Sequence, residues 1–227
     1  TIQDGVTWMG AIDWNRRLFD SLIPLPDGTS YNAYLVQGSE KTALLDTVEP
    51  AMLDTLMRQL DGVERLDYLV SHHAEQDHSG SIPAVLEKYP QAQLVCSTKA
   101  KALLKGHLGI DDTRITTVKD GEALSLGDKT LRFLHTAWVH WPETMVTHLP
   151  EAGMLFTCDL FGAHLATSSL CKGNEPEVYE AAKRYYAEIM MPFRRIIQKH
   201  LEKIGECDFQ CIAPSHGPIH TEPQHIL

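Results

Sequence analysis

Two imidazoles and two carboxylates gather in one short segment, His73-Ala74-Glu75-Gln76-Asp77-His78. Because side chains alternate along an extended backbone, His73, Glu75 and Asp77 can point to one side. His78 can join them only if the chain turns sharply after Asp77. Four donors that converge from one turn suit a pair of metal ions better than a single tetrahedral ion. The segment therefore predicts a dinuclear metal site.

Three further candidate ligands lie where an apolar, strand-like segment gives way to a loop: His140, Asp159 and His216. The first motif follows such a segment too. If the four strand ends share one edge of a fold, their loops can meet there. The expected ligand set is His73, Glu75, Asp77, His78, His140, Asp159 and His216. The spacing leaves out His72, His135 and His148.

Several neighbours of these ligands allow two interpretations. His164 either orients a ligand or supplies a proton from a second layer around the metals, or it is a hydrogen-bonded structural histidine. Trp141 and Tyr31 either line a pocket or pack in the core. Cys158 precedes Asp159 on a strand, so we expect a packed thiol that points to the opposite face.

The elements that must position these residues alternate between strands and helices. Strand-like segments pair across short turns at 31–36 with 42–47 and at 145–149 with 154–158, which indicates hairpins. Helical spacing covers 51–60, 82–89, 99–108 and 177–204, the last interrupted at Pro192. Two sheets packed face to face with helices outside fit this order. A doubly wound parallel sheet is the alternative, and the hairpins disfavour it.

Composition limits the possible partners and compartments. The chain has 227 residues, 43% hydrophobic and 22% charged, and a formal net charge of −10. That charge disfavours nucleic acids and acidic membranes, which reward clustered Lys and Arg. No segment predicts a bilayer span or a signal peptide. The odd count of 5 cysteines without a regular spacing favours free thiols in a reducing compartment, and we expect a cytoplasmic protein.

These motifs resemble the metallo-β-lactamase superfamily, whose first motif is His-x-His-x-Asp-His. Glu75 stands where that motif has its second His, and this substitution resembles the flavodiiron proteins. Their pattern is His-x-Glu-x-Asp-His, then a His before Trp-Pro, a bridging Asp and a late His. His140-Trp141-Pro142, Asp159 and the segment 214–218 follow in that order. The resemblance spans residues 1–227 and implies one α+β domain, an αββα sandwich of two mixed sheets.

The resemblance also implies a ligand assignment and an activity. His73, Glu75 and His140 would hold one iron, Asp77, His78 and His216 the other, and Asp159 would bridge them. The implied activity is that of an oxidoreductase that binds and reduces O2 or NO and draws electrons from a flavoprotein or a rubredoxin. A homodimer is implied as well. The family's FMN-binding flavodoxin domain would follow His216, and we expect no FMN site in residues 1–227. The sequence is either a piece of a longer protein or a domain that acts alone.

Two other functions remain possible at this stage. Without its own flavin, the domain would serve as an O2-binding sensor that reports to a signalling partner. The wider superfamily suggests a zinc hydrolase that uses a metal-bound hydroxide. Glu75 counts against the hydrolase, because a carboxylate in place of an imidazole makes the site harder and better suited to iron.

Overall fold

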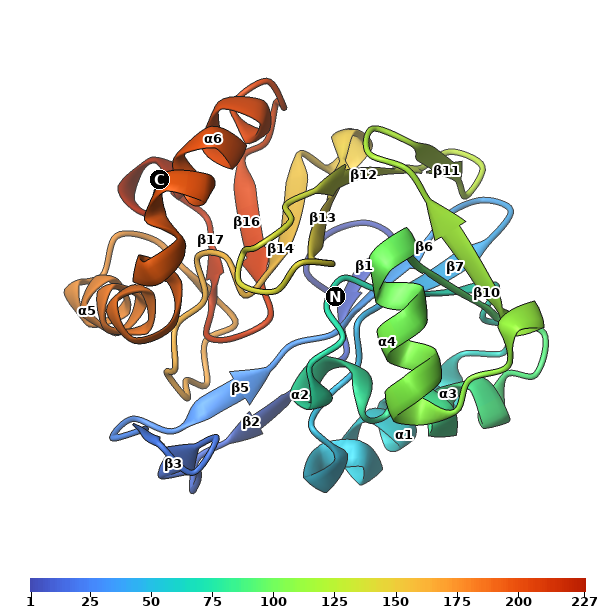
Figure 1. The fold of residues 1–227 in the computed structure, drawn as a ribbon, viewed down its shortest axis with the longest axis horizontal. Coiled ribbons are helices and arrows are strands. Elements are labelled where there is room, and N and C mark those ends of the chain that lie inside the picture. The colour runs from blue at the N-terminus through green and yellow to red at the C-terminus, as the bar shows by residue number, and fades with distance from the viewer.

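Two β-sheets lie face to face at the centre of the computed structural model, which describes residues 1–227 (Figure 1). The strands of the first sheet are β1 (Val6–Trp8), β6 (Tyr34–Gln37), β7 (Thr42–Leu45), β8 (Tyr68–Ser71), β9 (Gln93–Ser97) and β10 (Ile115–Val118). Those of the second are β11 (Ala123–Ser125), β12 (Thr130–His135), β13 (Met145–Leu149), β14 (Met154–Cys158), β16 (Cys211–Pro214), β17 (Ile219–His220) and β15 (Cys171–Lys172). Two short ribbons pair β2 (Ala11–Asp13) with β5 (Thr29–Tyr31) and β3 (Leu18–Phe19) with β4 (Ile23–Pro24). The helices are α1 (Leu53–Gln59), α2 (Gln76–Ser79), α3 (Ile82–Lys88), α4 (Thr98–Leu108), α5 (Pro176–Tyr185) and α6 (Arg194–Ile204).

Both sheets are mixed, as the hairpins predict. In the first sheet β1, β6 and β7 are antiparallel, and β7 to β10 run parallel. In the second sheet β11 to β14 are antiparallel, and β14 pairs with β16 in parallel. A doubly wound parallel sheet is thus excluded. The expected hairpins are β6–β7 and β13–β14.

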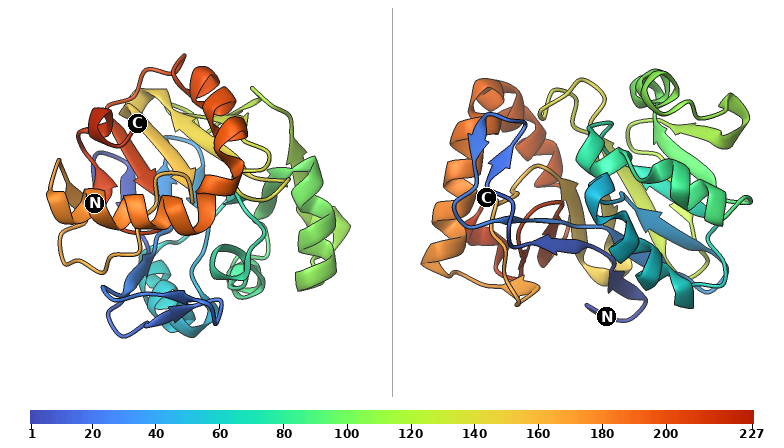
Figure 2. Two further views of the ribbon diagram at one scale, coloured as in Figure 1. Left: turned by 60° about the vertical axis from the view of Figure 1, so that its left-hand side comes forward. Right: turned by 90° about the horizontal axis from the view of Figure 1, so that it is seen from below.

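Three apolar clusters separate the layers. Along β8, Leu69 points to the cluster under α1, α3 and α4, whereas Val70 points to the cluster between the sheets. Alternate residues of an extended strand face opposite sides, and here both sides are covered. On the far side, Leu155 of β14 packs with Ile197 of α6. The two groups of helices flank the strands from opposite sides (Figure 2), so the predicted αββα sandwich is confirmed.

Helix ends follow local sequence signals. Ser97 caps α4 by accepting a hydrogen bond from the Ala100 amide, and Gly109 ends it with φ of 66°. The long helical pattern 177–204 is divided, as Pro192 predicts. A π-helical segment, Tyr186–Met190, and a short 3₁₀ turn separate α5 from α6. No helix has the length and apolar character that crossing a bilayer requires.

Candidate metal centre

The first motif folds into the sharp turn that it requires. Glu75 has an extended backbone with a ψ of 148°, and α2 begins at the next residue. Asp77 and His78 are therefore helical, which brings the His78 imidazole back toward His73. The two rings lie 5.7 Å apart. The change from extended to helical backbone lets four neighbouring donors converge.

The other three candidates arrive from the second sheet. His140 lies in the loop between β12 and β13, and His216 follows β16. Asp159 follows β14, where the register with β16 shifts between Phe156 and Cys158 and Cys158 has a φ of 51°. This bulge turns Asp159 into the site. It also makes the expectation for Cys158 wrong in part: the thiol is buried, but its Sγ lies within 4.8 Å of donor atoms of His78 and Asp159.

One group of donors surrounds Glu75. Its Oε2 lies 3.0 Å from Nε2 of His73 and 3.1 Å from Nε2 of His140. Oδ2 of Asp159 lies 3.6 Å from the same His73 atom and 3.3 Å from the same His140 atom. We call His73, Glu75 and His140 the open half-site, because the side chains of Glu75 and His140 are 14% and 15% exposed.

A second group surrounds Asp77 and is fully enclosed. Its Oδ2 lies 3.4 Å from Nε2 of His78 and 3.1 Å from Nε2 of His216. The other oxygen of Asp159, Oδ1, lies 3.0 Å from His78 Nε2 and 3.5 Å from His216 Nε2. We call Asp77, His78 and His216 the closed half-site, since each of its side chains is at most 3% exposed. Asp159 thus offers one oxygen to each half-site.

These donors fit metal ions better than hydrogen bonds to one another. Ligands about 2.1 Å from a shared ion stand roughly 3.0 to 3.4 Å apart, close to the separations above. Both oxygens of Asp77 and Asp159 and both ring nitrogens of His78 are buried without a hydrogen-bond partner. Buried polar atoms left unpaired are costly, so a bound cation would satisfy them. Imidazole and carboxylate donors together suit iron or zinc.

The imidazoles and carboxylates of the site shift one another's pKa values. Burial alone would lower the pKa of His216, but its contacts with Asp159 and Asp77 outweigh burial and raise the pKa to about 10. For His140, burial is likewise outweighed by Asp159 and Glu75, and its pKa rises to about 9. Burial would raise the pKa of Glu75, yet the neighbouring His140 and His73 lower it. Cations are thus favoured where the carboxylates converge.

A carboxylate that the sequence reasoning missed orients His73. Glu143 Oε1 lies 2.7 Å from His73 Nδ1 and also accepts a hydrogen bond from the Ala74 amide at 3.0 Å. This contact fixes the proton on Nδ1 and leaves Nε2 free to bind a metal. The available signal was its place two residues after Trp141, on the loop that carries His140. In the closed half-site, the Ser30 carbonyl accepts from His216 Nδ1 at 2.8 Å.

Two of the three histidines that the spacing leaves out make other bonds, whereas the buried Nε2 of the third, His135, has no hydrogen-bond partner. His72 contacts Asp46 Oδ2 through Nδ1 at 2.6 Å and Thr147 Oγ1 through Nε2 at 2.7 Å, which ties the first motif to both sheets. His148 Nε2 donates to the Asp208 carbonyl at 2.9 Å. Neither ring is directed at the ligand cluster.

Two of the residues that allow two interpretations, His164 and Tyr31, lie beside His216. The ring of His164 lies 4.9 Å from His216 and 4.8 Å from Tyr185, its Nδ1 contacts Thr29 Oγ1, and its buried Nε2 has no partner. Tyr31 is fully buried with its ring 5.8 Å from His216, so it packs in the core beside the site.

Trp141 lines a cavity at the open half-site. Its ring stands edge-on to His73 at 4.9 Å, and it borders a cavity of about 450 Å³ together with Asp20, Glu75 and His107. Glu75 thus borders a hollow at the open half-site.

Comparison with known proteins agrees with this fold. A family model described as "ODP family beta lactamase" matches residues 29–217. The nitric oxide reductase of Moorella thermoacetica is 40% identical over 235 residues, which cover 100% of this chain and 59% of that protein. The structure of the rubredoxin oxygen:oxidoreductase of Desulfovibrio gigas superposes with a TM-score of 0.94 at 34% identity, over 99% of this chain and 58% of that one. The flavodiiron protein of Giardia intestinalis superposes with a TM-score of 0.93 at 29% identity, over 99% of this chain and 56% of that one.

The two facing sheets and the strand-end donors define a metallo-β-lactamase-like domain. More specifically, the chain belongs to the ODP beta-lactamase family and corresponds to the metallo-β-lactamase-like domain of the flavodiiron proteins. It spans 59% of the length of the first two curated relatives that it matches.

Proposed function

We propose that this domain is the diiron core of an oxidoreductase that binds and reduces O2, NO or both. The observation that carries the proposal is the position of Glu75, whose Oε2 lies within 3.1 Å of Nε2 of both His73 and His140. Each half-site then combines two imidazoles with one carboxylate and shares Asp159. The similarity to a nitric oxide reductase and a rubredoxin oxygen:oxidoreductase supports the same conclusion.

The seven ligands would hold two irons, with the open and closed half-sites on one iron each and Asp159 between them. A pair of irons supplies electrons and open coordination positions for a diatomic ligand. The protein's own residues orient the imidazoles and keep the open half-site accessible. Glu143 and the Ser30 carbonyl hold the protons of His73 and His216 on Nδ1, so that Nε2 faces the centre. The cavity beside Trp141 admits a small molecule to the open half-site.

Turnover requires electrons from outside this domain. Reduction of O2 to water consumes four electrons and four protons, and reduction of two NO to N2O and water consumes two of each. We therefore propose an external donor, a flavoprotein or a rubredoxin, and retain the homodimer as a prediction.

Metal content and diatomic reactivity test the proposal together. The metal-free chain is loaded anaerobically with ferrous iron, desalted, assayed for metal, and mixed with O2 or NO in a stopped-flow instrument. We expect two irons per chain, rapid oxidation by O2 and N2O in the headspace after NO, with repeated turnover once a reduced flavoprotein is added.

Other outcomes separate the alternatives. A persistent oxygenated species without turnover would favour the sensor. Stoichiometric zinc retained in competition with iron, without reactivity toward either gas, would contradict iron chemistry. The Glu75→His variant should shift metal preference from iron toward zinc, whereas Glu151→Gln, a carboxylate remote from the site, should not.

A further inference from the structure

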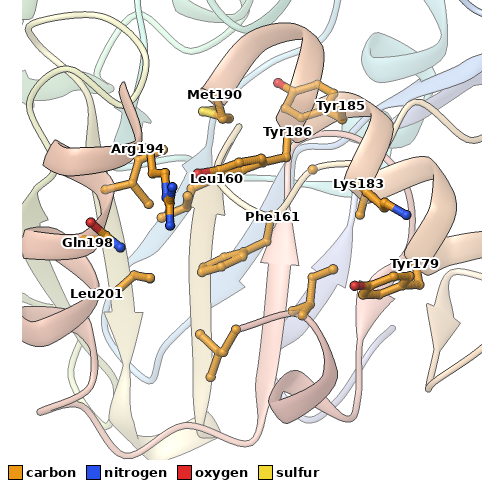
Figure 3. Close-up of a pocket in the computed structure, with 15 residues that line it drawn as sticks. Leu160, Phe161, Tyr179, Lys183, Tyr185, Tyr186, Met190, Arg194, Gln198 and Leu201 are labelled. Atoms are coloured by element: carbon orange, nitrogen blue, oxygen red, sulfur yellow. The ribbon is translucent and has the colours of Figure 1, made fainter. Parts of the chain in front are cut away.

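A second cavity lies behind the metal centre, away from the Trp141 entrance. It has a volume of about 340 Å³ and is formed between the loop after β14 and the helices α5 and α6 (Figure 3). Of the 15 residues that line it, 11 are hydrophobic. This volume lies in the range of small-molecule sites, about 300 to 1,000 Å³, and the apolar lining is typical of them.

The floor of the cavity adjoins the metal ligands. Leu160 and Phe161 directly follow Asp159, and the Phe161 side chain points into the centre of the cavity (Figure 3). Tyr185 forms part of the wall, and its ring lies 4.8 Å from His164 and 5.8 Å from His216. The π-helical segment Tyr186–Met190 supplies another part of the wall, and such segments often occur at functional sites.

Polar groups converge at one end of this apolar cavity. The guanidinium of Arg194, the amide of Gln198 and the hydroxyl of Tyr186 lie on the same side in Figure 3. None of the three makes a side-chain hydrogen bond or an ion pair within the chain. Lys183 lies on the opposite side and is engaged only by Glu180, at 3.7 Å, in an exposed pair of little strength. Arg194 is therefore an exposed cation without a partner in the chain, at the edge of an apolar surface.

We propose that this cavity binds a small amphipathic carboxylate. The planar guanidinium of Arg194 matches a carboxylate through two parallel hydrogen bonds, and the Gln198 amide and Tyr186 hydroxyl are additional donors. The hydrocarbon part of the ligand covers Phe161 and the apolar residues of α5 and α6. A mostly apolar lining favours a hydrocarbon body over a sugar phosphate or a nucleotide, which would leave polar groups unpaired.

Isothermal titration calorimetry with octanoate, and with 1-octanol as the uncharged analogue, tests this proposal on the whole 227-residue chain without metal. We expect saturable binding of one octanoate per chain and up to about fivefold weaker binding of 1-octanol, because an ion pair at an exposed cation contributes about 0.2 to 1 kcal/mol. Arg194→Gln should lower octanoate affinity up to about fivefold and leave 1-octanol unchanged.

Two further variants keep the proposal falsifiable. Arg195→Gln removes the adjacent exposed cation, which does not line the cavity, and should leave octanoate affinity unchanged. Leu201→Trp should fill the cavity and abolish binding of both probes; Ala182→Leu serves the same purpose if the larger change disturbs the thermal melting curve. Equal losses in Arg194→Gln and Arg195→Gln, equal affinity for the two probes, or unchanged binding in the filled variants would overturn the proposal.

Discussion

The open and closed half-sites use the same donor types in different surroundings. Each has two imidazoles and one carboxylate, and each faces one oxygen of Asp159. The closed half-site is sealed, with His78 and His216 each 1% exposed, whereas the open half-site borders a cavity of about 450 Å³. Their supports differ as well: a side chain, Glu143, orients His73, and a backbone carbonyl, that of Ser30, orients His216.

The difference indicates a division of roles. A metal ion in the closed half-site would be shielded from exchange, and its ligands are fixed by the packing of the core. The open half-site borders a cavity, and its His73 is oriented by Glu143, a side chain that a substitution can change. Four experiments test whether the two half-sites differ in this way, and the expected effect decreases from the first to the last.

Substitution of Asp159, which offers one oxygen to each half-site, should weaken metal binding in both half-sites. In Asp159→Asn both half-sites lose an anionic oxygen within 3.6 Å of their imidazoles, and the charge that offsets four histidines falls. We expect the metal content after reconstitution to fall to a small fraction of the unaltered level, as measured by plasma mass spectrometry. Glu206→Gln, an exposed carboxylate away from the site, is the control. Retention of one tightly held metal would show that Asp159 serves only one half-site.

Rescue by free imidazole should separate the half-sites. His140→Gly opens a space that reaches solvent, because the His140 side chain is 15% exposed, whereas His216→Gly opens a space sealed from it. Millimolar imidazole should therefore restore the missing metal in His140→Gly and not in His216→Gly. Titration of metal content against imidazole, with N-methylacetamide as a non-ligating control, measures this. Equal rescue of both variants would contradict the sealed character of the closed half-site.

Removal of the Glu143 carboxylate should weaken only the open half-site. Glu143→Gln exchanges an anionic acceptor for a neutral one and loses the charge contact with His73 at 2.7 Å. Partners of this kind typically change metal affinity by about 10- to 100-fold. Competition with a chelator should show one weakened and one unchanged metal. If both weaken equally, Glu143 acts through the fold rather than through His73.

The layers of the fold and the convergence of the candidate ligand side chains could be predicted from the sequence, because both depend on periodicity. Leu69 and Val70 sit on neighbouring positions with opposite faces, so a strand covered on both sides is visible in the sequence. His73, Glu75 and Asp77 are close in sequence, and the turn at α2 follows from the need to bring in His78.

What the sequence could not supply depends on single backbone angles and distant contacts. The positive φ of Cys158 breaks the alternation that placed its thiol on the far face. Glu143 meets His73 across 70 positions of sequence, and Ser30 meets His216 across 186. No local pattern encodes such pairs. The N-terminal ribbons β2–β5 and β3–β4 were also missed, because strands of two or three residues carry too little periodicity.

The smallest expected effect is a pH-dependent change in the number of protons released on metal binding. Without metal, the contacts described above outweigh burial and raise the pKa of His140 to about 9 and that of His216 to about 10. Both imidazoles thus carry a proton at neutral pH that a metal ion must displace, so metal affinity should rise with pH. A raised pKa means that this proton cost persists up to the pKa and disappears above it.

Metal binding should consequently cease to displace a proton from His140 at a lower pH than from His216. Between about pH 7.5 and pH 9.5 His140 becomes mostly neutral while His216 stays mostly protonated, so the protons released per chain on metal binding should fall by somewhat less than one. Calorimetry in buffers of different ionisation enthalpy measures this number. The fall should largely disappear in His140→Ala and persist in His216→Ala. The reverse assignment would mean that the closed half-site, despite its burial, holds the more weakly bound proton.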